Sequence, residues 1–282
     1  KQRRYFQGAY REEQHAFTLV FSAPQDTFPL IRALRPSEVD SLGNDSAWVD
    51  FRDYSMLQVS KNMDTITYWL TDSLAIGMDS IYLQMQYVVT DSLYNLVPQT
   101  DTVLAVYRRP RMSEKAREAI EKKKRERKLE LKTNTSTSFD IYDTIRITSA
   151  FPIDSIHDTL FHLTQKVDTI YQPIPFRIEK KDSLAMTLYL VAALQPEMTY
   201  RLKVDSAACR DIYGACNDSI QKNIKLKSKD DYSSLRVKMV HFDARARIQL
   251  LNEKEEVIRE VVATEEGVKL EYLAPTTFFL RL

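Results

Sequence analysis

Glycine, histidine and cysteine are all scarce in this sequence. Its 282 residues include 5 glycines, 4 histidines and 2 cysteines. Phosphate-binding loops depend on glycine, and most metal sites depend on histidine or cysteine, so the composition argues against both kinds of site. The sequence also lacks nucleophile-elbow, zinc-protease and P-loop motifs. We therefore expect a protein that is not an enzyme and that binds no cofactor.

The sequence has no strong net charge and no long hydrophobic run. Its 40 Lys and Arg residues nearly balance its 39 Asp and Glu residues, which leaves a net charge of +1. Such a balanced chain is not typical of a nucleic-acid binder. No stretch approaches the roughly 18 apolar residues of a membrane-spanning helix. Hydrophobic residues make up 44% of the chain, which is enough for packed cores, and the length predicts two or three domains.

Period-two alternation of apolar and polar residues is the dominant pattern. It recurs in short runs rich in Tyr, Phe, Val, Ile and Thr, which favour strands. The clearest runs cover residues 17–21, 81–87, 187–190, 200–204 and 235–240. Asp-Ser and Asp-Thr pairs lie between the runs, and we interpret them as turn formers because they are too scattered to form a calcium loop. The pattern predicts an all-β protein built from sandwiches.

The two halves of the chain repeat one pattern. Residues 19–26 open the first half and residues 147–154 open the second with a similar strand and turn. A turn that begins at Asp91 matches one that begins at Asp211, with Asn95 where the second copy has glycine. The matching segments in the later part of each half keep a nearly constant offset of about 120 positions, which is typical of a duplicated unit.

A basic segment separates the two copies. Residues 108–132 contain 12 Lys and Arg but only 5 Asp and Glu, and Ser113 is suited to cap a short helix. The predicted domains are therefore a first immunoglobulin-like sandwich (1–110), a basic helical linker (111–133), a second immunoglobulin-like sandwich (134–230) and the start of a third β-sandwich (231–282). The third part contains five strand candidates, with hairpin turns predicted at 252–255 and 264–267. It stops inside an apolar strand, so we expect the natural protein to continue beyond it.

The two cysteines flank a turn that contains Gly214. The spacing of Cys209 and Cys216 fits neither a zinc ribbon nor a thioredoxin-type site. A disulfide between them would stabilise the fold by roughly 2.5 kcal/mol in the chain-entropy view. We expect this disulfide, and with it an oxidising compartment such as a periplasm or a cell surface. Two free, half-buried thiols are the alternative.

Two further groups of residues are candidate sites. His157 and His162 lie near several aspartates, but their odd spacing would place them on opposite faces of a strand, so a solvated insertion is expected rather than a metal site. The basic segment could make peripheral contact with anionic lipid, lipopolysaccharide or an acidic protein, although a solvated spacer is the alternative. The candidate contact residues are Lys122, Lys123, Lys124, Arg125, Arg127 and Lys128.

Two motifs in the second copy resemble a known family. Residues 194–204 read Leu-x-Pro-x-x-x-Tyr-x-Leu-x-Val, and residues 211–217 contain an Asp-x-x-Gly turn that is followed by Asn217. These motifs resemble the bacterial immunoglobulin-like domains of surface-layer and outer-membrane proteins. The last segment, with Leu273-Ala274-Pro275, is similar to a prealbumin-like sandwich. This order of domains is similar to that of outer-membrane lipoproteins of the Bacteroidota.

The resemblance implies export, a lipid anchor outside this sequence and a location on the periplasmic or cell-surface face of the outer membrane. It also implies a structural or scaffolding subunit of an outer-membrane protein complex, whose partners are other envelope proteins. A surface carbohydrate-binding module is the alternative function. Sugar binding would need an exposed aromatic platform, and Trp69, one of the two tryptophans, lies in an expected core strand.

Overall fold

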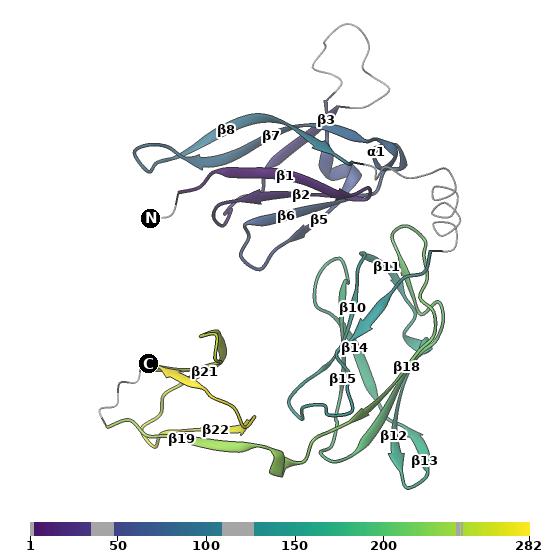
Figure 1. Cartoon of the computed structure of the whole chain (residues 1–282), viewed down its shortest axis with the longest axis vertical. Coiled ribbons are helices and arrows are strands. Elements are labelled where there is room, and N and C mark those ends of the chain that lie inside the picture. The colour runs from purple at the N-terminus through teal and green to yellow at the C-terminus, as the bar shows by residue number, and fades with distance from the viewer. Residues whose placement is uncertain (1–2, 35–47, 109–126, 241–242, 244) are drawn as a thin grey trace, which may run out of the picture.

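The computed structural model describes residues 3–34, 48–108, 127–240, 243 and 245–282. This part of the chain is almost entirely antiparallel β-structure and forms three units that follow one another along the sequence (Figure 1). The first two units are tandem β-sandwiches, which confirms the expected all-β fold class. No helix among the described residues is long and apolar enough to cross a membrane.

The first sandwich has two four-stranded sheets. One sheet has the order β1 (Phe6–Glu13), β2 (Ala16–Phe21), β6 (Thr65–Leu70), β5 (Ser55–Val59). The other has the order β4 (Trp48–Asp50), β3 (Leu30–Leu34), β7 (Ser80–Thr90), β8 (Leu96–Val106). The 3₁₀ turn η3 (Phe51–Tyr54) and the short helix α1 (Ser73–Gly77) connect strands. The Asp72 carboxylate caps α1 by accepting the N–H of Ala75, which is the turn role expected of an Asp-Ser pair.

The second sandwich repeats this plan. One sheet has the order β14 (Phe176–Lys180), β15 (Thr187–Ala192), β10 (Ile145–Ser149), β9 (Leu131–Thr133). The other has the order β13 (Ile170–Pro173), β12 (Phe161–Val167), β16 (Thr199–Val204), β18 (Ile220–Lys225). A two-stranded sheet of β11 (Ile153–Ile156) and β17 (Cys209–Asp211), with the 3₁₀ turns η4 (Asp158–Leu160) and η5 (Lys229–Asp231), completes the unit.

The strand orders of the two sandwiches correspond one to one, as the repeated sequence pattern predicts. The order β1-β2-β6-β5 matches β9-β10-β15-β14, and β4-β3-β7-β8 matches β13-β12-β16-β18. Side-chain register agrees as well, because Leu19 pairs with Ile66 in the first copy and Ile147 pairs with Leu188 in the second. The chain therefore contains two copies of one sandwich topology.

One detail of the predicted alignment is corrected. The residue that takes the place of Gly214 in the first copy is Tyr94, not Asn95. Tyr94 has a φ of 62° and Gly214 has a φ of 84°, so both sit in the left-handed region that turns of this kind require. Asn95 instead donates its N–H to the Asp91 carboxylate, as Ala215 does to Asp211.

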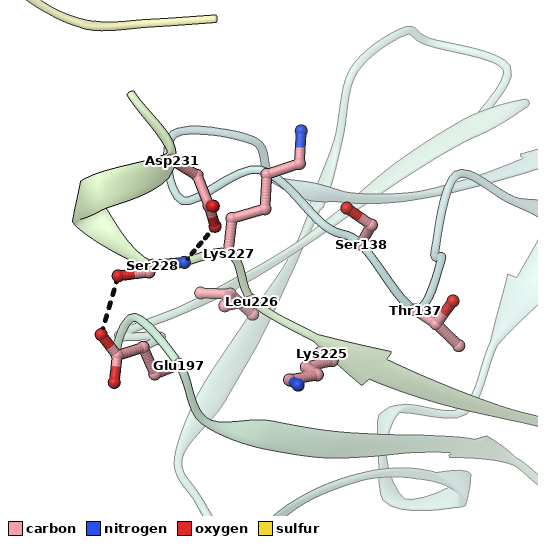
Figure 2. A pocket seen from close by; sticks show the side chains of 8 residues that line it. All are labelled: Thr137, Ser138, Glu197, Lys225, Leu226, Lys227, Ser228 and Asp231. Carbon is pink, nitrogen blue, oxygen red and sulfur yellow. Dashed lines mark hydrogen bonds between the residues drawn. The ribbon is translucent and has the colours of Figure 1, made fainter. Parts of the chain in front are cut away.

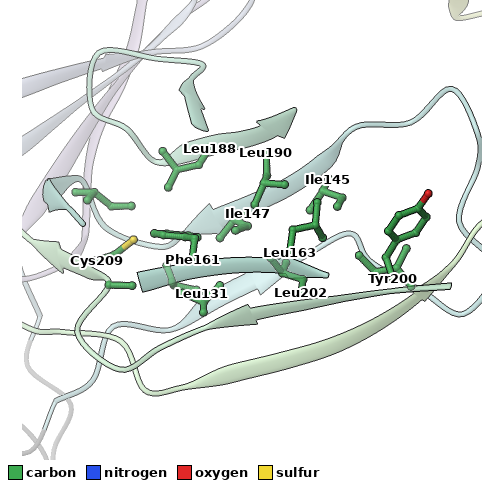
Figure 3. Close-up of a cluster of buried hydrophobic side chains, with 14 of the residues drawn as sticks. Leu131, Ile145, Ile147, Phe161, Leu163, Leu188, Leu190, Tyr200, Leu202 and Cys209 are labelled. Atoms are coloured by element: carbon green, nitrogen blue, oxygen red, sulfur yellow. The ribbon is translucent and has the colours of Figure 1, made fainter. Parts of the chain in front are cut away.

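The core of the second sandwich lies between its two sheets (Figure 3). Alternate residues of each strand point inward, which is why period two was visible in the sequence. Ile147 of β10 and Leu188 of β15 meet Leu163 of β12 and Leu202 of β16 in this layer. Leu129 and Leu131 are also buried here, so the last residues of the expected linker belong to the second sandwich. Residues 109–126, most of that linker, lie outside the described residues, and the domain boundaries otherwise stay predictions.

Tyr200 offers a test of this core. Its ring is fully buried, and its hydroxyl accepts a hydrogen bond of 2.7 Å from the backbone N–H of Gln195. Replacing Tyr200 with phenylalanine is expected to reduce the free energy of unfolding by about 1–2 kcal/mol, because the Gln195 N–H loses its partner. Urea unfolding followed by circular dichroism measures the change. The matched control is Tyr142→Phe, which removes an exposed hydroxyl, and an equal loss in both variants would contradict the prediction.

The third unit contains the five expected strands in two small sheets. β19 (Ser233–Val237) pairs with β22 (Val268–Leu273), and β20 (Arg247–Leu251) lies between β21 (Val257–Val262) and β23 (Phe279–Arg281). The turn at 252–255 joins β20 and β21 as a hairpin, as predicted. The prediction of a hairpin at 264–267 was wrong. This turn carries the chain from one sheet to the other, so that Val268 and Leu270 bury against Ile248 and Leu250.

Candidate functional site

The junction between the first and second sandwiches is the strongest candidate for a functional site. Ala16 of β2 and Trp69 of β6 are buried there together with Leu184 of the second sandwich, although the two sandwiches are far apart in sequence. Phe151 packs on this cluster with its ring centroid 5.8 Å from that of Trp69. The Ser149 hydroxyl accepts the N–H of Phe151 and donates to the Phe151 carbonyl oxygen, which fixes the turn that carries this ring.

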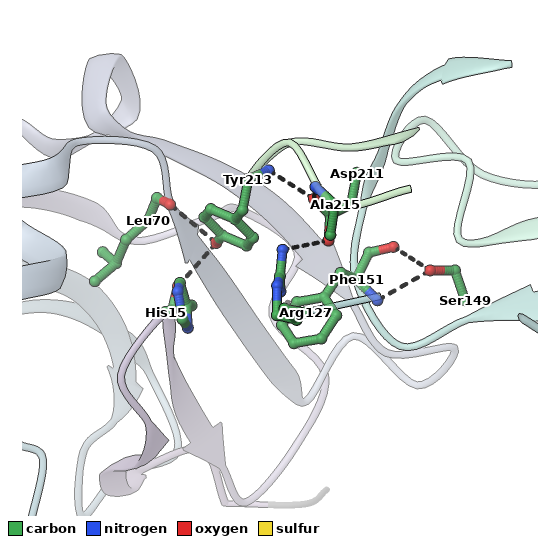
Figure 4. Close-up of polar contacts among 8 residues, drawn as sticks. All are labelled: His15, Leu70, Arg127, Ser149, Phe151, Asp211, Tyr213 and Ala215. Carbon is green, nitrogen blue, oxygen red and sulfur yellow. Dashed lines mark hydrogen bonds and ion pairs between the residues drawn. The ribbon is translucent and has the colours of Figure 1, made fainter. Parts of the chain in front are cut away.

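Tyr213 makes the polar contacts of the junction (Figure 4). Its hydroxyl lies 2.9 Å from the carbonyl oxygen of Leu70 and 3.2 Å from that of His15, and it donates to these oxygens at the ends of β6 and β2. Its ring lies 4.5 Å from the His15 ring between centroids. Burial raises the pKa of the Tyr213 hydroxyl, so it remains a donor over the whole physiological pH range.

Asp211 and Arg127 hold Tyr213 in place (Figure 4). One carboxylate oxygen of Asp211 accepts the N–H groups of Tyr213 and Ala215, and the other lies 2.6 Å from the Arg127 guanidinium. The Asp211 side chain is 0% exposed. The guanidinium also lies over the rings of Phe151 and Tyr213, at 4.6 and 5.4 Å from their centroids. The buried charge is therefore neutralised and hydrogen-bonded, as a stable buried carboxylate requires.

Of the six basic residues that the sequence predicts as contacts for an anionic partner, the structure describes two. Arg127 pairs with Asp211, and Lys128 lies 3.1 Å from the exposed carboxylate of Asp218, so both are engaged within the chain. Arg127 thus serves the junction between the sandwiches. Lys122, Lys123, Lys124 and Arg125 lie outside the described residues, and their contact with an anionic partner stays a prediction.

The expected disulfide is not present, because Cys209 and Cys216 are free thiols. The register explains this correction. Cys216 pairs with Arg210. The Cys209 carbonyl oxygen accepts the Asn217 N–H, and the Cys209 N–H donates to the side-chain oxygen of Asn217. Successive residues of a strand point to opposite faces, so the two thiols diverge. Cys209 enters the core shown in Figure 3, and Cys216 is half-buried.

The thiols should differ in reactivity. Burial raises the pKa of Cys209 to about 12, so this residue has almost no thiolate at pH 8. We expect Cys216 to react with a disulfide reagent at least about tenfold faster than Cys209 in the folded protein. Mass spectrometry of the labelled peptides measures both rates, and Cys216→Ser is the control that isolates Cys209. Fewer than two reactive thiols in the denatured, unreduced protein would contradict this prediction.

In the histidine cluster, His162 makes a hydrogen bond at the protein surface. His162 lies 2.8 Å from the Asp205 carboxylate, and Lys203 lies 2.7 Å from it. Hydrogen bonds from Lys203 and His162 lower the pKa of Asp205. Among the described residues, no group of three or more His, Cys, Asp or Glu side chains is arranged to hold a metal ion.

A pocket of about 410 Å³ lies where the second sandwich leads into the third unit (Figure 2). Several of its polar groups bond to one another. The Ser228 hydroxyl donates to Glu197, and the Ser228 N–H donates to Asp231. Nearby, the Tyr232 hydroxyl donates to Asp140 at 2.7 Å and accepts the N–H of Ile141. These contacts attach the third unit to the second sandwich.

No protein-family model and no curated protein sequence matches the chain. Among solved structures, it is similar to domains 1–6 of the surface layer protein SbsC, with 12% identity, 98% of this chain and 31% of that chain covered, and a TM-score of 0.34. It is also similar to the MG0-NIE-MG1 domains of alpha-2-macroglobulin from Escherichia coli, with 10% identity, coverages of 99% and 92%, and a TM-score of 0.28. A third match is Dpr2 Ig1-Ig2 in complex with DIP-Theta Ig1-Ig3, with 8% identity, coverages of 80% and 99%, and a TM-score of 0.21. At these values, no property of these proteins is carried over to this chain.

The sequence singled out Arg127 as a possible contact for an anionic partner and Trp69 as a core residue, but it did not predict the junction. Phe151 and Tyr213 both lie in turns of the repeated pattern, where large aromatic residues are not expected. A comparison of the two copies could have indicated the junction. Phe151 stands where the first copy has Ala23, and Tyr213 stands where it has Leu93. An aromatic residue at a turn position where the other copy has an aliphatic one indicates that the two turns pack against different surroundings.

Proposed function

We propose that this chain is a non-catalytic scaffolding subunit of a cell-envelope protein assembly. The observation that carries the proposal is the junction, in which Tyr213, Phe151 and the Arg127–Asp211 pair hold the two sandwiches in one relative orientation. Domains joined by a small polar contact usually move independently. A junction with a buried apolar cluster and a fully buried ion-paired carboxylate keeps binding surfaces at a fixed spacing, which suits a scaffold.

The first sandwich also offers a surface of the kind that binding partners use. β8 is an 11-residue strand at the edge of its sheet, where it pairs with β7 along its length. Leu96, Leu104 and Val106 of this strand are exposed. An edge strand presents unpaired backbone groups to which another chain can add a strand. Partner binding by strand addition at β8 fits the proposed scaffolding role.

The proposed location is the outer membrane, with a lipid anchor outside this sequence. The support for this part is the resemblance of residues 194–204 and 211–217 to immunoglobulin-like domains of surface-layer and outer-membrane proteins. The prealbumin-like character of the third unit belongs to the same proposal.

Cell fractionation with cross-linking tests the proposal. The tagged full protein, expressed in its own organism, is expected in the envelope fraction and in a cross-linked assembly of higher mass. Leu104→Glu should reduce this assembly, because the charge would lie on the β8 surface. The matched control is Leu74→Glu on α1, which is also an exposed leucine. A cytoplasmic, monomeric protein would refute the proposal.

Carbohydrate binding remains a second candidate because of one pocket. A hollow of about 380 Å³ lies on the outer face of the β1-β2-β6 sheet, and Tyr10, Thr18 and Thr67 line it. Tyr10 lies against Gly8, where a Cβ would come within 3.1 Å of the Tyr10 hydroxyl, and the two threonine hydroxyls are 2.9 Å apart. An exposed ring beside hydroxyl groups suits sugar binding. Screening the purified chain and its Tyr10→Ala variant on a glycan array tests this candidate, and an array without a specific signal would rule it out.

A further inference from the structure

The turn that docks the second sandwich onto the first has a counterpart in the first sandwich. In the second copy, Asp211 accepts the N–H groups of Tyr213 and Ala215 at 2.9 Å each. In the first copy, Asp91 accepts those of Leu93 and Asn95 at 2.8 Å each. The backbone bonds from Gly214 to Asp211 and from Tyr94 to Asp91 also correspond. The two turns therefore have the same conformation.

The flanking contacts are repeated in part. The Arg127 guanidinium lies 5.4 Å from the centroid of Tyr213, and the Arg3 guanidinium lies 5.2 Å from the centroid of Tyr94. In both copies, the arginine comes from the segment that leads into the sandwich. The first sandwich thus has a similar arrangement of an Asp-centred turn, an aromatic ring and a covering arginine.

The two turns differ in what covers them. Tyr213 is packed against the end of the preceding sandwich, whereas Leu93 at the equivalent position is 78% exposed. Tyr94 and Leu96 beside it are also exposed, so three large apolar side chains lie open within four residues. Figure 1 shows this β7–β8 turn at the end of the first sandwich that lies near the N-terminus, away from α1. A turn held in a docking conformation with its apolar residues open to solvent indicates a missing partner.

We infer that the Asp91–Asn95 turn docks onto the end of a β-sandwich domain of a separate partner protein. The occupied junction shows what such a partner must offer: carbonyl oxygens at two strand ends, such as those of His15 and Leu70, beside an apolar cluster. In the proposed complex, Leu93 has no hydroxyl and packs against the apolar cluster of the partner. The Tyr94 hydroxyl donates to the carbonyl oxygens at the strand ends of the partner.

A second copy of this chain is a poorer fit as the partner. The sandwich end formed by His15 and Leu70 is covered by Tyr213. The corresponding end of the second sandwich, beside Asp140 and Ile141, is covered by Tyr232 of the third unit. Among the described residues of the two sandwiches, both such ends are therefore occupied, which argues against a second copy of this chain as the partner.

This inference rests on the proposed scaffolding role, and a photo-cross-linking experiment tests it. A benzophenone amino acid replaces Leu93 in the full protein, expressed in its own organism, and the cross-linked peptides are identified by mass spectrometry. The matched control carries the same group at Leu74, which is 63% exposed at the other end of the same sandwich. We expect position 93, and not position 74, to cross-link to a strand end in a β-sandwich domain of one partner. Leu93→Asp should weaken the association about tenfold or more, because it loses the burial of a leucine side chain.

Three results would overturn the inference. They are equal cross-linking at positions 93 and 74, a cross-linked peptide outside a β-sandwich domain, and cross-linking to a second copy of the chain. The first two leave the scaffolding proposal intact if the Leu93→Asp chain still enters its envelope assembly. If the unmodified chain enters no assembly, the scaffolding proposal fails as well.

Discussion

Replacing Asp211 with alanine is expected to destabilise the second sandwich by roughly 3–5 kcal/mol. The side chain is fully buried, and its two oxygens satisfy the N–H groups of Tyr213 and Ala215 and the Arg127 guanidinium. Alanine leaves two backbone donors and a half-buried cation without their acceptor. Such losses cost much more than the net gain of one hydrogen bond, because the groups are already removed from water. Urea unfolding followed by far-ultraviolet circular dichroism measures the effect.

Asp91→Ala is the matched control for this prediction. The Asp91 carboxylate makes the same turn bonds, to the N–H groups of Leu93 and Asn95, but it lies at the surface. Water can replace it as the acceptor, so we expect a clearly smaller loss of stability. Equal losses in the two variants would show that the turn alone, and not the buried ion pair, determines the stability.

The strands were predictable because apolar and polar residues alternate along strands in every unit. The residues that were expected to alternate, such as Leu188 and Leu190 in β15, do point into the core. The duplication was predictable for the same reason, since both copies bury the same strand positions. Turn chemistry was also visible in the sequence, as the Asp72 and Asp211 carboxylates show.

What the sequence did not reveal depends on register and on contacts between distant segments. The spacing of Cys209 and Cys216 permits a disulfide, but the pairing of Arg210 with Cys216 sends the thiols to opposite faces. The turn at 264–267 has the residues of a hairpin, yet a turn does not specify which sheet the next strand joins. The junction is the largest omission, because Phe151 is partly buried by a different sandwich, and no local pattern reports such burial.

Replacing Tyr213 with alanine should uncouple the two sandwiches while leaving both folded. The variant loses the hydroxyl contacts to the Leu70 and His15 carbonyl oxygens and the ring contact with His15. A central aromatic residue of an interface contributes roughly 2–4 kcal/mol, so most of the coupling free energy should disappear. Tyr213→Phe keeps the ring and should lose only about 1 kcal/mol.

Two measurements read out this uncoupling. Small-angle X-ray scattering should show a larger radius of gyration for Tyr213→Ala, because the sandwiches then sample many orientations. Fluorescence should show a more solvent-exposed Trp69, since that ring is buried at the junction. Leu93→Ala is the control, because it changes the equivalent turn residue, which makes no contact at this junction. If Tyr213→Ala kept the scattering profile and the fluorescence of the unmodified chain, the apolar cluster around Phe151 would be sufficient to fix the orientation, and Tyr213 would have no coupling role.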